Sequence, residues 1–455
     1  MKVAKLRGVM ILLSFAFVAA EARALAEDRL APGAPGKDAE WSSAGKQAAG
    51  TANSLASKVW FTLQGGALTE VFYPTADIAN VHFLEFVVVN PSRKTVETER
   101  EDTNSRVEML NPHALTFRQI NTAKNGEWKI IKTYTTDPQR NTVLIAVQFQ
   151  SKNSRLQLYV YFDPSLNNSG MHDSAWSDGD ALMASDADKF SALLASGGFS
   201  ETTNGFYGAS DGLGDLRENG RISVSYTRAE NGNVAQLARV RNPRRLTLAL
   251  GFGSTASEAL DAARGSLTKG FRACGREYQT GWLDVIHSLP RVDVKYQDQF
   301  NVAVLVLKAL EDKTFRGATI ASPSAPWIHG PAANEPYVGG YHLVWARDLY
   351  HVATAYLALG DKAAAERALN YLFRVQQRSD GSFPQISWID GKPVGDAVQM
   401  DEVSYPLILA YQLRRYDRET YQKHVQPAAD YIVRNGPVTQ QERWEEKRGY
   451  SPATI

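Results

Sequence analysis

Residues 141–162 read NTVLIAVQFQSKNSRLQLYVYF, and their pattern decides the fold of the first half of the chain. Two runs in this stretch place apolar side chains at every second position. The first run is Val143, Ile145, Val147 and Phe149, and the second is Leu156, Leu158, Val160 and Phe162. Alternation with a period of two predicts β-strands that are half-buried in an antiparallel sheet.

The same alternation continues on both sides of this stretch, from about Trp60 to Phe252. It recurs in Ile222, Val224 and Tyr226, and again in Leu246, Leu248 and Leu250. Turn signals such as Asn125-Gly126 separate the runs. Many short strands in succession favour a β-sandwich, which we expect to occupy residues 51–255.

The apolar period changes to that of helices after the strands. We expect a helical linker over residues 256–295 and a helical domain over residues 296–455. The predicted helix faces are Val302, Leu305, Val306 and Ala309; Leu349, Val352, Ala353 and Tyr356; Ala365, Leu369, Leu372 and Val375; Val403, Leu407 and Ala410; and Tyr421, Val425, Ala428 and Ile432. Strands first and helices after them indicate an α+β chain of two domains, with the helices arranged as stacked hairpins.

The first residues carry the pattern of a secretory signal peptide. Basic residues within positions 2–7 precede an apolar run from Val9 to Ala20, and Ala24-Leu25-Ala26 has the small residues of a cleavage site. We expect residues 1–26 to be removed and the protein to be secreted or periplasmic; an N-terminal anchor helix is the alternative. No later stretch is apolar enough to span a membrane. Residues 27–50 indicate a flexible leader.

Charge and cysteine content exclude some classes of function. The 50 basic and 49 acidic residues leave a formal net charge of +1, which offers no electrostatic reason to expect a nucleic-acid partner. The single cysteine, Cys274, excludes an internal disulfide framework and a Cys-rich metal site. No nearby His would activate its thiol, so packing is the favoured role for this residue.

Three polar and aromatic segments lie between the predicted helices, where a helical domain of this kind would place a binding site. In the first, residues 339–348, Arg347 and Asp348 offer a donor fork beside an acceptor, and Trp345 offers a flat face for a sugar ring. The residues alone equally allow Asp348 to complement a helix dipole and Arg347 to form a surface ion pair.

The second segment, residues 380–402, contains Trp388 as a further stacking surface and Asp401-Glu402 at a helix start, where capping is the simpler interpretation. The third, residues 442–452, places Glu442, Trp444, Glu445 and Glu446 together. One carboxyl of such a cluster can be kept protonated and donate a proton to a glycosidic oxygen. A solvated charge cluster is the alternative.

Together these segments resemble the glucoamylase family of glycoside hydrolases, in particular its prokaryotic, glucodextranase-like branch. The resemblance also covers residues 57–74, SKVWFTLQGGALTEVFYP, and the short motifs at 307–309 and 345–348. It implies a β-sandwich followed by an (α/α)6 barrel. It further implies an exo-acting, inverting enzyme that releases glucose from the non-reducing ends of α-glucans.

The resemblance assigns roles to individual residues. Glu445 matches the general acid, and Glu446 matches the substrate-binding carboxylate beside it. Arg347 and Asp348 match the pair that holds the terminal glucose, and Glu442 falls where members place an acidic residue near the acid. We count Trp345, Trp388 and Trp444 as further substrate-binding residues.

Two departures from the family pattern affect the expected activity. An aromatic residue that members often carry before the Gln399–Glu402 segment is replaced by 393–397, PVGDA. The family's catalytic base lies well downstream of the acid, and no residue follows Ile455. We therefore expect an incomplete barrel of about five helices and, if Ile455 is the true end of the protein, essentially no activity.

Two alternative functions remain open, a secreted carbohydrate-binding protein and a sugar phosphorylase. Glucans linked α-1,4 or α-1,6 and trehalose are equally compatible substrates. We expect no cofactor; calcium stays an open alternative, although no Asp-rich loop resembles a known ligand pattern. The sequence does not indicate an oligomeric state.

Overall fold

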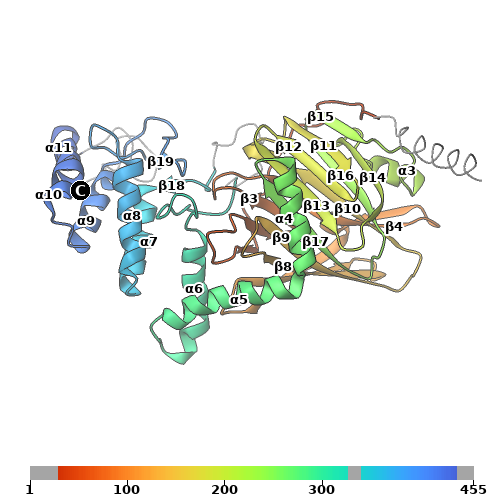
Figure 1. Cartoon of the computed structure of the whole chain (residues 1–455), viewed down its shortest axis with the longest axis horizontal. Coiled ribbons are helices and arrows are strands. Elements are labelled where there is room, and N and C mark those ends of the chain that lie inside the picture. The colour runs from red at the N-terminus through yellow and green to blue at the C-terminus, as the bar shows by residue number, and fades with distance from the viewer. Residues whose placement is uncertain (1–28, 326–339, 438–455) are drawn as a thin grey trace, which may run out of the picture.

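The computed structural model describes residues 29–325 and 340–437 (Figure 1). Two β-sheets form the first part of the molecule, and a group of helices forms the second. Helices α5 (Phe271–Ser288) and α6 (Gln297–Ala309) connect the two parts.

The sheets pack face to face, and all of their paired strands are antiparallel. The eight-stranded sheet has the order β1-β2-β3-β4-β10-β16-β14, with β5 beside β4. Its strands are β1 (Ala48–Gly50), β2 (Trp60–Gln64), β3 (Ala67–Phe72), β4 (Val81–Asn90), β5 (Thr95–Thr98), β10 (Gln157–Pro164), β14 (Phe199–Phe206) and β16 (Val234–Val240).

The nine-stranded sheet has the order β15-β11-β12-β13-β17-β9-β8-β7-β6. Its strands are β6 (Thr103–Asn111), β7 (Thr116–Ala123), β8 (Trp128–Thr136), β9 (Thr142–Ser151), β11 (Asp173–Asp178), β12 (Ala181–Asp186), β13 (Lys189–Ala195), β15 (Arg228–Gly232) and β17 (Arg245–Gly253). Short helices α2 (Glu99–Asp102), η1 (Leu166–Asn168) and α3 (Leu213–Asn219) lie in the connections.

The predicted apolar faces of β9 and β10 meet in the core between the sheets. Val143 and Ile145 from one sheet belong to the same buried cluster as Leu158 and Val160 from the other. The alternating pattern thus identified the two inner faces, and the predicted antiparallel sandwich is confirmed.

One predicted strand is wrong. Residues 222–226 alternate like a strand, but they form a loop between α3 and β15. The carboxylate of Asp215 accepts hydrogen bonds from the backbone N–H groups of Ser223 (2.6 Å) and Val224 (3.1 Å). Because a side chain takes the place of a partner strand, the alternation does not lead to a sheet.

The segment predicted as a flexible leader is packed against the rest of the protein over its described part, residues 29–50. Ala31 N donates to Arg228 O (2.8 Å), and β1 pairs with β2. Trp41 is only 3% exposed and belongs to the core of the helical part. The prediction of a loose leader is wrong here, because a large apolar side chain such as Trp41 packs into a core even when Gly, Pro and charged residues surround it in the sequence.

The segment predicted as a helical linker packs on the sandwich. Helix α4 (Ala256–Lys269) lies on the outer face of the nine-stranded sheet, where Ala259 and Ala263 are buried with Leu144 and Ala249 (Figure 1). Helix α5 contributes Trp282 to the core between the sheets. Both helices are therefore part of the sandwich body.

The helical part contains elements at each of the five predicted faces. After η2 (Val294–Tyr296) and α6 come β18 (Val344–Trp345), α7 (Ala346–Ala358), α8 (Lys362–Tyr371), η3 (Leu372–Gln376), β19 (Ile386–Ser387), α9 (Met400–Gln412), α10 (Arg418–Thr420), η4 (Tyr421–Val425) and α11 (Gln426–Asn435). Among the residues that the structure describes, no helix has the length and apolar character needed to cross a lipid bilayer.

The sandwich and the helices meet in a polar and aromatic junction. The indole N–H of Trp60 donates to Ala309 O (2.7 Å), and Lys313 Nζ donates to Thr51 Oγ1 (2.6 Å). The loop between β3 and β4 also enters the junction, where Asp77 Oδ2 accepts from Ile389 N (2.9 Å). This last contact holds the loop that carries Trp388.

Candidate active site

Two of the three predicted segments come together at the start of helix α7. Strand β18 pairs with β19, so that Trp345 lies opposite Ile386. Helix α7 begins at Ala346, directly after this pair, and α9 begins nearby at Met400. Contacts of Arg347 with Gln399 and Asp401 show that the first turns of both helices lie side by side.

Arg347 joins these two helix starts. Its Nη1 lies 2.7 Å from Gln399 Oε1, 3.1 Å from Asp401 Oδ2 and 3.2 Å from Glu402 Oε1. All four side chains are buried. Nη1 therefore donates hydrogen bonds to Gln399 and Asp401 and lies within ion-pair distance of Glu402, which fixes the direction of the arginine side chain.

The charges around Arg347 are strongly coupled. Burial raises the pKa of Glu402 well above its usual value, although Arg347 acts in the opposite direction. Burial opposes the charge of Arg347 as well, but Glu402 and Asp401 outweigh it and raise the pKa of the guanidinium. Arg347 thus remains positively charged. Because Glu402 holds its proton more readily than it would in water, the cluster around Arg347 carries less negative charge than two fully ionised carboxylates would.

Asp348 differs from its neighbour in being exposed. It lies in the first turn of α7, where the helix dipole favours a carboxylate, but burial raises the pKa of this carboxyl group although Arg347 acts in the opposite direction. A fixed buried cation thus lies next to an exposed carboxyl group.

The two predicted tryptophans that the structure describes, Trp345 and Trp388, differ in exposure. Trp345 is 8% exposed and stacks on Tyr341, with ring centroids 5.4 Å apart. Trp388 is half-buried and meets the ring of His342 edge-on at 6.0 Å. Trp388 therefore has more of its face available than Trp345.

His342 and Gln399 are supporting residues to which the sequence assigned no role. His342 is buried, and burial lowers its pKa to about 4, so the ring is neutral at ordinary pH. The only sequence signal for Gln399 is its place before Asp401-Glu402 at a helix start. Its role as an acceptor for Arg347 depends on a contact 52 residues away along the chain.

The third predicted segment lies outside the described residues. This applies to Glu442, Trp444, Glu445 and Glu446, so the structure does not place the expected proton donor. Within the described ranges, no group of three or more His, Cys, Asp or Glu side chains is arranged to hold a metal ion.

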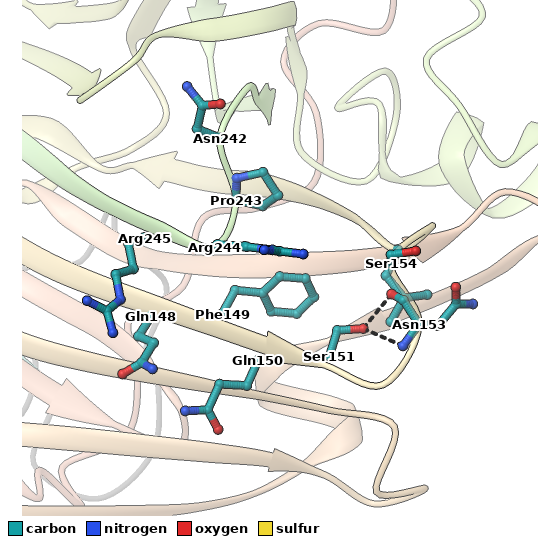
Figure 2. A pocket seen from close by; sticks show the side chains of 11 residues that line it. Gln148, Phe149, Gln150, Ser151, Asn153, Ser154, Asn242, Pro243, Arg244 and Arg245 are labelled. Atoms are coloured by element: carbon teal, nitrogen blue, oxygen red, sulfur yellow. Dashed lines mark hydrogen bonds between the residues drawn. The ribbon is translucent and has the colours of Figure 1, made fainter.

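A pocket of about 810 Å³ lies on the sandwich, away from Arg347. It is lined by residues of β9, the connection from β9 to β10, the turn before β17 and the start of β17 (Figure 2). The cluster around Arg347 is nevertheless the better candidate for catalysis, because it combines buried charge, shifted pKa values and aromatic surfaces.

Known families match most of the chain. Residues 31–286 match the family described as "Glucodextranase, domain N", and residues 295–455 match "Glycosyl hydrolases family 15". The first match extends beyond the predicted sandwich boundary at residue 255 and includes α4 and nearly all of α5.

Similar proteins agree with these families. A glucoamylase of Clostridium sp. (strain G0005) is 39% identical over 430 residues, which are 92% of this chain and 60% of that protein. A bacterial glucoamylase solved in complex with acarbose is 37% identical with a TM-score of 0.87, over 93% of this chain and 63% of that one. The chain thus spans about three fifths of these relatives. The likeness confirms the predicted fold class, a β-sandwich followed by helices of an (α/α)6 barrel.

A putative kojibiose phosphorylase from the human microbiome shares the fold alone. It is 10% identical with a TM-score of 0.50, over 84% of this chain and 51% of that one.

Proposed function

Because the chain belongs to glycosyl hydrolase family 15, with an N-terminal domain of the glucodextranase type, we propose that it is an exo-acting, inverting hydrolase of α-glucans. It would release glucose from non-reducing chain ends. The observation that carries the proposal is that buried Arg347 and exposed Asp348 are adjacent at the start of α7.

Arg347 and Asp348 would hold the terminal glucose through its hydroxyl groups. The guanidinium is fixed by Gln399, Asp401 and Glu402, so little side-chain entropy is lost when a ligand binds. Asp348 supplies an acceptor beside this donor. The half-buried ring of Trp388 offers a stacking face near the same site.

Glu445 would protonate the glycosidic oxygen as the bond breaks. In an inverting reaction a second carboxylate activates a water molecule on the opposite face of the sugar, about 6.5–9.5 Å from the acid. Glu446 would bind substrate next to the acid, and Glu442 and Trp444 would complete its surroundings. These assignments rest on the family match over residues 295–455.

The test is to incubate the protein with maltooligosaccharides and to follow the products by proton NMR. We expect glucose to appear first as the β-anomer, without added phosphate. Formation of glucose phosphate only when phosphate is present would identify a phosphorylase. Binding of maltooligosaccharide without any release of sugar would identify a carbohydrate-binding protein.

We also propose that the protein is exported. The support is the pattern of residues 1–26, with a basic start, an apolar run and small residues before Ala26. N-terminal sequencing of the protein from its native cells should find a mature chain that starts near residue 27. A chain that retains Met1 in the cytoplasm would contradict export.

A further inference from the structure

Two neighbouring pockets on the sandwich share two lining residues, and we treat them together as one groove. The first, of about 810 Å³, lies at the end of β9 and the start of β17; the second, of about 800 Å³, lies on the outer face of the nine-stranded sheet. They share Gln148 and Arg245, which are paired across β9 and β17. The groove, defined here as these two pockets, thus runs across four adjacent strands, β7, β8, β9 and β17.

The floor of the groove is the part of this sheet that α4 leaves uncovered. Ile120, Ile131, Thr133, Ala146 and Thr247 lie along it, and the first turn of α5, with Phe271 and Arg272, forms one wall. Four strands supply the floor, so its shape is rigid. An extended floor of this kind suits a chain-like ligand more than a compact one.

The charge of the groove is of one sign. Four arginines line it, namely Arg118, Arg244, Arg245 and Arg272, and neither pocket contains an aspartate or glutamate. This contrasts with the chain as a whole, in which basic and acidic residues are almost equal in number. Within the described ranges, none of the four has an ion-pair partner.

Arg118 brings a buried hydrogen-bond donor to the groove. Its Nε is buried and finds no hydrogen-bond acceptor among the described residues. Glu108 lies directly opposite on β6, but its carboxylate is paired with Arg106 (2.9 Å). A buried N–H without an acceptor is costly, and an anionic oxygen in the groove would satisfy it.

The other end of the groove offers groups that bind sugars. Figure 2 shows Arg244 extending above the ring of Phe149, while Arg245 lies beside Gln148. Amide and hydroxyl side chains complete this end, namely Gln148, Gln150, Asn153, Asn242, Ser151 and Ser154. Amides and hydroxyls hydrogen-bond to sugar hydroxyl groups, and arginine forks match carboxylate and phosphate oxygens.

We propose that this groove binds an acidic polysaccharide through carboxylate or phosphate groups on its sugar units. The site lies on the sandwich and shares no residue with the Arg347 cluster, so it does not depend on the proposed hydrolase activity. It would attach the protein to an anionic glycan while the helical part acts on its own substrate.

Calorimetric titration with oligosaccharides of matched length tests the proposal. The probes are oligogalacturonate, which carries carboxylates, a phosphorylated maltodextrin and neutral maltoheptaose, each at about 50 and 300 mM salt. We expect at least one acidic probe to bind in the groove about tenfold or more tightly than the neutral one, and to weaken as salt rises. Which acidic probe binds identifies the anionic group.

Two variants locate the binding. The double variant Arg244→Gln/Arg245→Gln should weaken binding of the acidic probe about tenfold or more. Gln148→Glu, which places a carboxylate opposite Arg245, should weaken it as well. Both changes are at the surface, so the unfolding temperature should stay near that of the unmodified protein. The control Arg221→Gln, at an exposed arginine outside both pockets, should bind normally.

Three outcomes would overturn the proposal. One is equal affinity for acidic and neutral probes, and another is unchanged affinity in both groove variants. The third is tighter binding of a DNA oligonucleotide of equal charge than of either acidic glycan, because the groove would then recognise a different class of macromolecule.

Discussion

Nη1 of Arg347 lies 3.1 Å from Oδ2 of Asp401, and this contact joins two helix starts that are 54 residues apart in the sequence. An arginine at a helix start could equally have pointed into solvent. Its burial against Gln399, Asp401 and Glu402 makes it the fixed point of the candidate site, and Asp348 follows it directly in the chain.

Replacing Arg347 with Lys should weaken substrate binding with a smaller effect on folding. Lysine keeps the charge but loses the planar fork, so we expect the Kd for a maltooligosaccharide to rise at least about tenfold. Calorimetric titration measures the change. Arg367→Lys is the control, because Arg367 makes a two-point contact with Glu311 (2.8 and 2.9 Å) away from the site. If both variants bind the sugar equally well, Arg347 is structural only.

Replacing Glu445 with Gln should separate catalysis from binding. The amide cannot donate the required proton, and loss of a general acid commonly costs on the order of 10²–10⁴ in rate. Sugar affinity should stay nearly constant, since the shape and polarity of the side chain are kept. Glucose release and calorimetry on the same samples measure both. Near-normal turnover would remove Glu445 from its assigned role.

Replacing Asp77 with Asn should stabilise the protein at neutral pH. Burial raises the pKa of Asp77 from 3.8 to about 6, so the folded state retains its proton after the unfolded state has lost it. The wild type therefore loses stability as pH rises between these values, by about 3 kcal/mol in total.

The variant lacks this penalty, because an amide can still accept from Ile389 N and bond to Thr75. Denaturant unfolding at pH 4 and pH 7 should show the gain only at the higher pH. Asp390→Asn, at an exposed aspartate in the neighbouring turn, is the control. Equal effects at both pH values would contradict the proposed ionisation.

Replacing Trp60 with Phe should weaken the junction between sandwich and helices. The change leaves Ala309 O without its 2.7 Å hydrogen bond and removes part of the ring that lies 4.7 Å from Lys313 Nζ. We expect a loss of about 2–4 kcal/mol in the free energy of unfolding.

Trp41→Phe is a matched control for this substitution. Trp41 is equally buried, but its indole N–H has no hydrogen-bond partner among the described residues. The same loss of volume should therefore cost less at Trp41 than at Trp60. A larger loss at Trp41 would show that packing, and not the hydrogen bond, dominates at the junction.

The sequence predicted the layers of the fold well, because burial leaves a periodic signal. Alternation in β9 and β10 identified the two inner faces, and helical spacing identified the elements from α6 to α11. Alternation predicted a strand wrongly at residues 222–226, where the Asp215 carboxylate accepts hydrogen bonds from the backbone N–H groups. It also missed Tyr159 and Tyr161, whose side of the sheet is covered by α3, since tyrosine is polar enough to pass as exposed.

The candidate site was predictable only in part. Arg347, Asp348 and Trp388 stand out as residue types that suit sugar binding. The partners of Arg347 depend on a pairing of distant segments that no local pattern encodes. Asp401 in particular was interpreted as a helix cap, and it is also an ion-pair partner.

The contact between Asp77 and Ile389 has a consequence for exchanging domains between relatives. A loop of the sandwich supports the backbone next to Trp388, so the sandwich contributes to the shape of the proposed sugar site although it provides none of the predicted binding residues. A chimera that combines this helical part with a foreign sandwich would therefore also exchange that support. Keeping residues 75–79 of the native sandwich in such a chimera should preserve it.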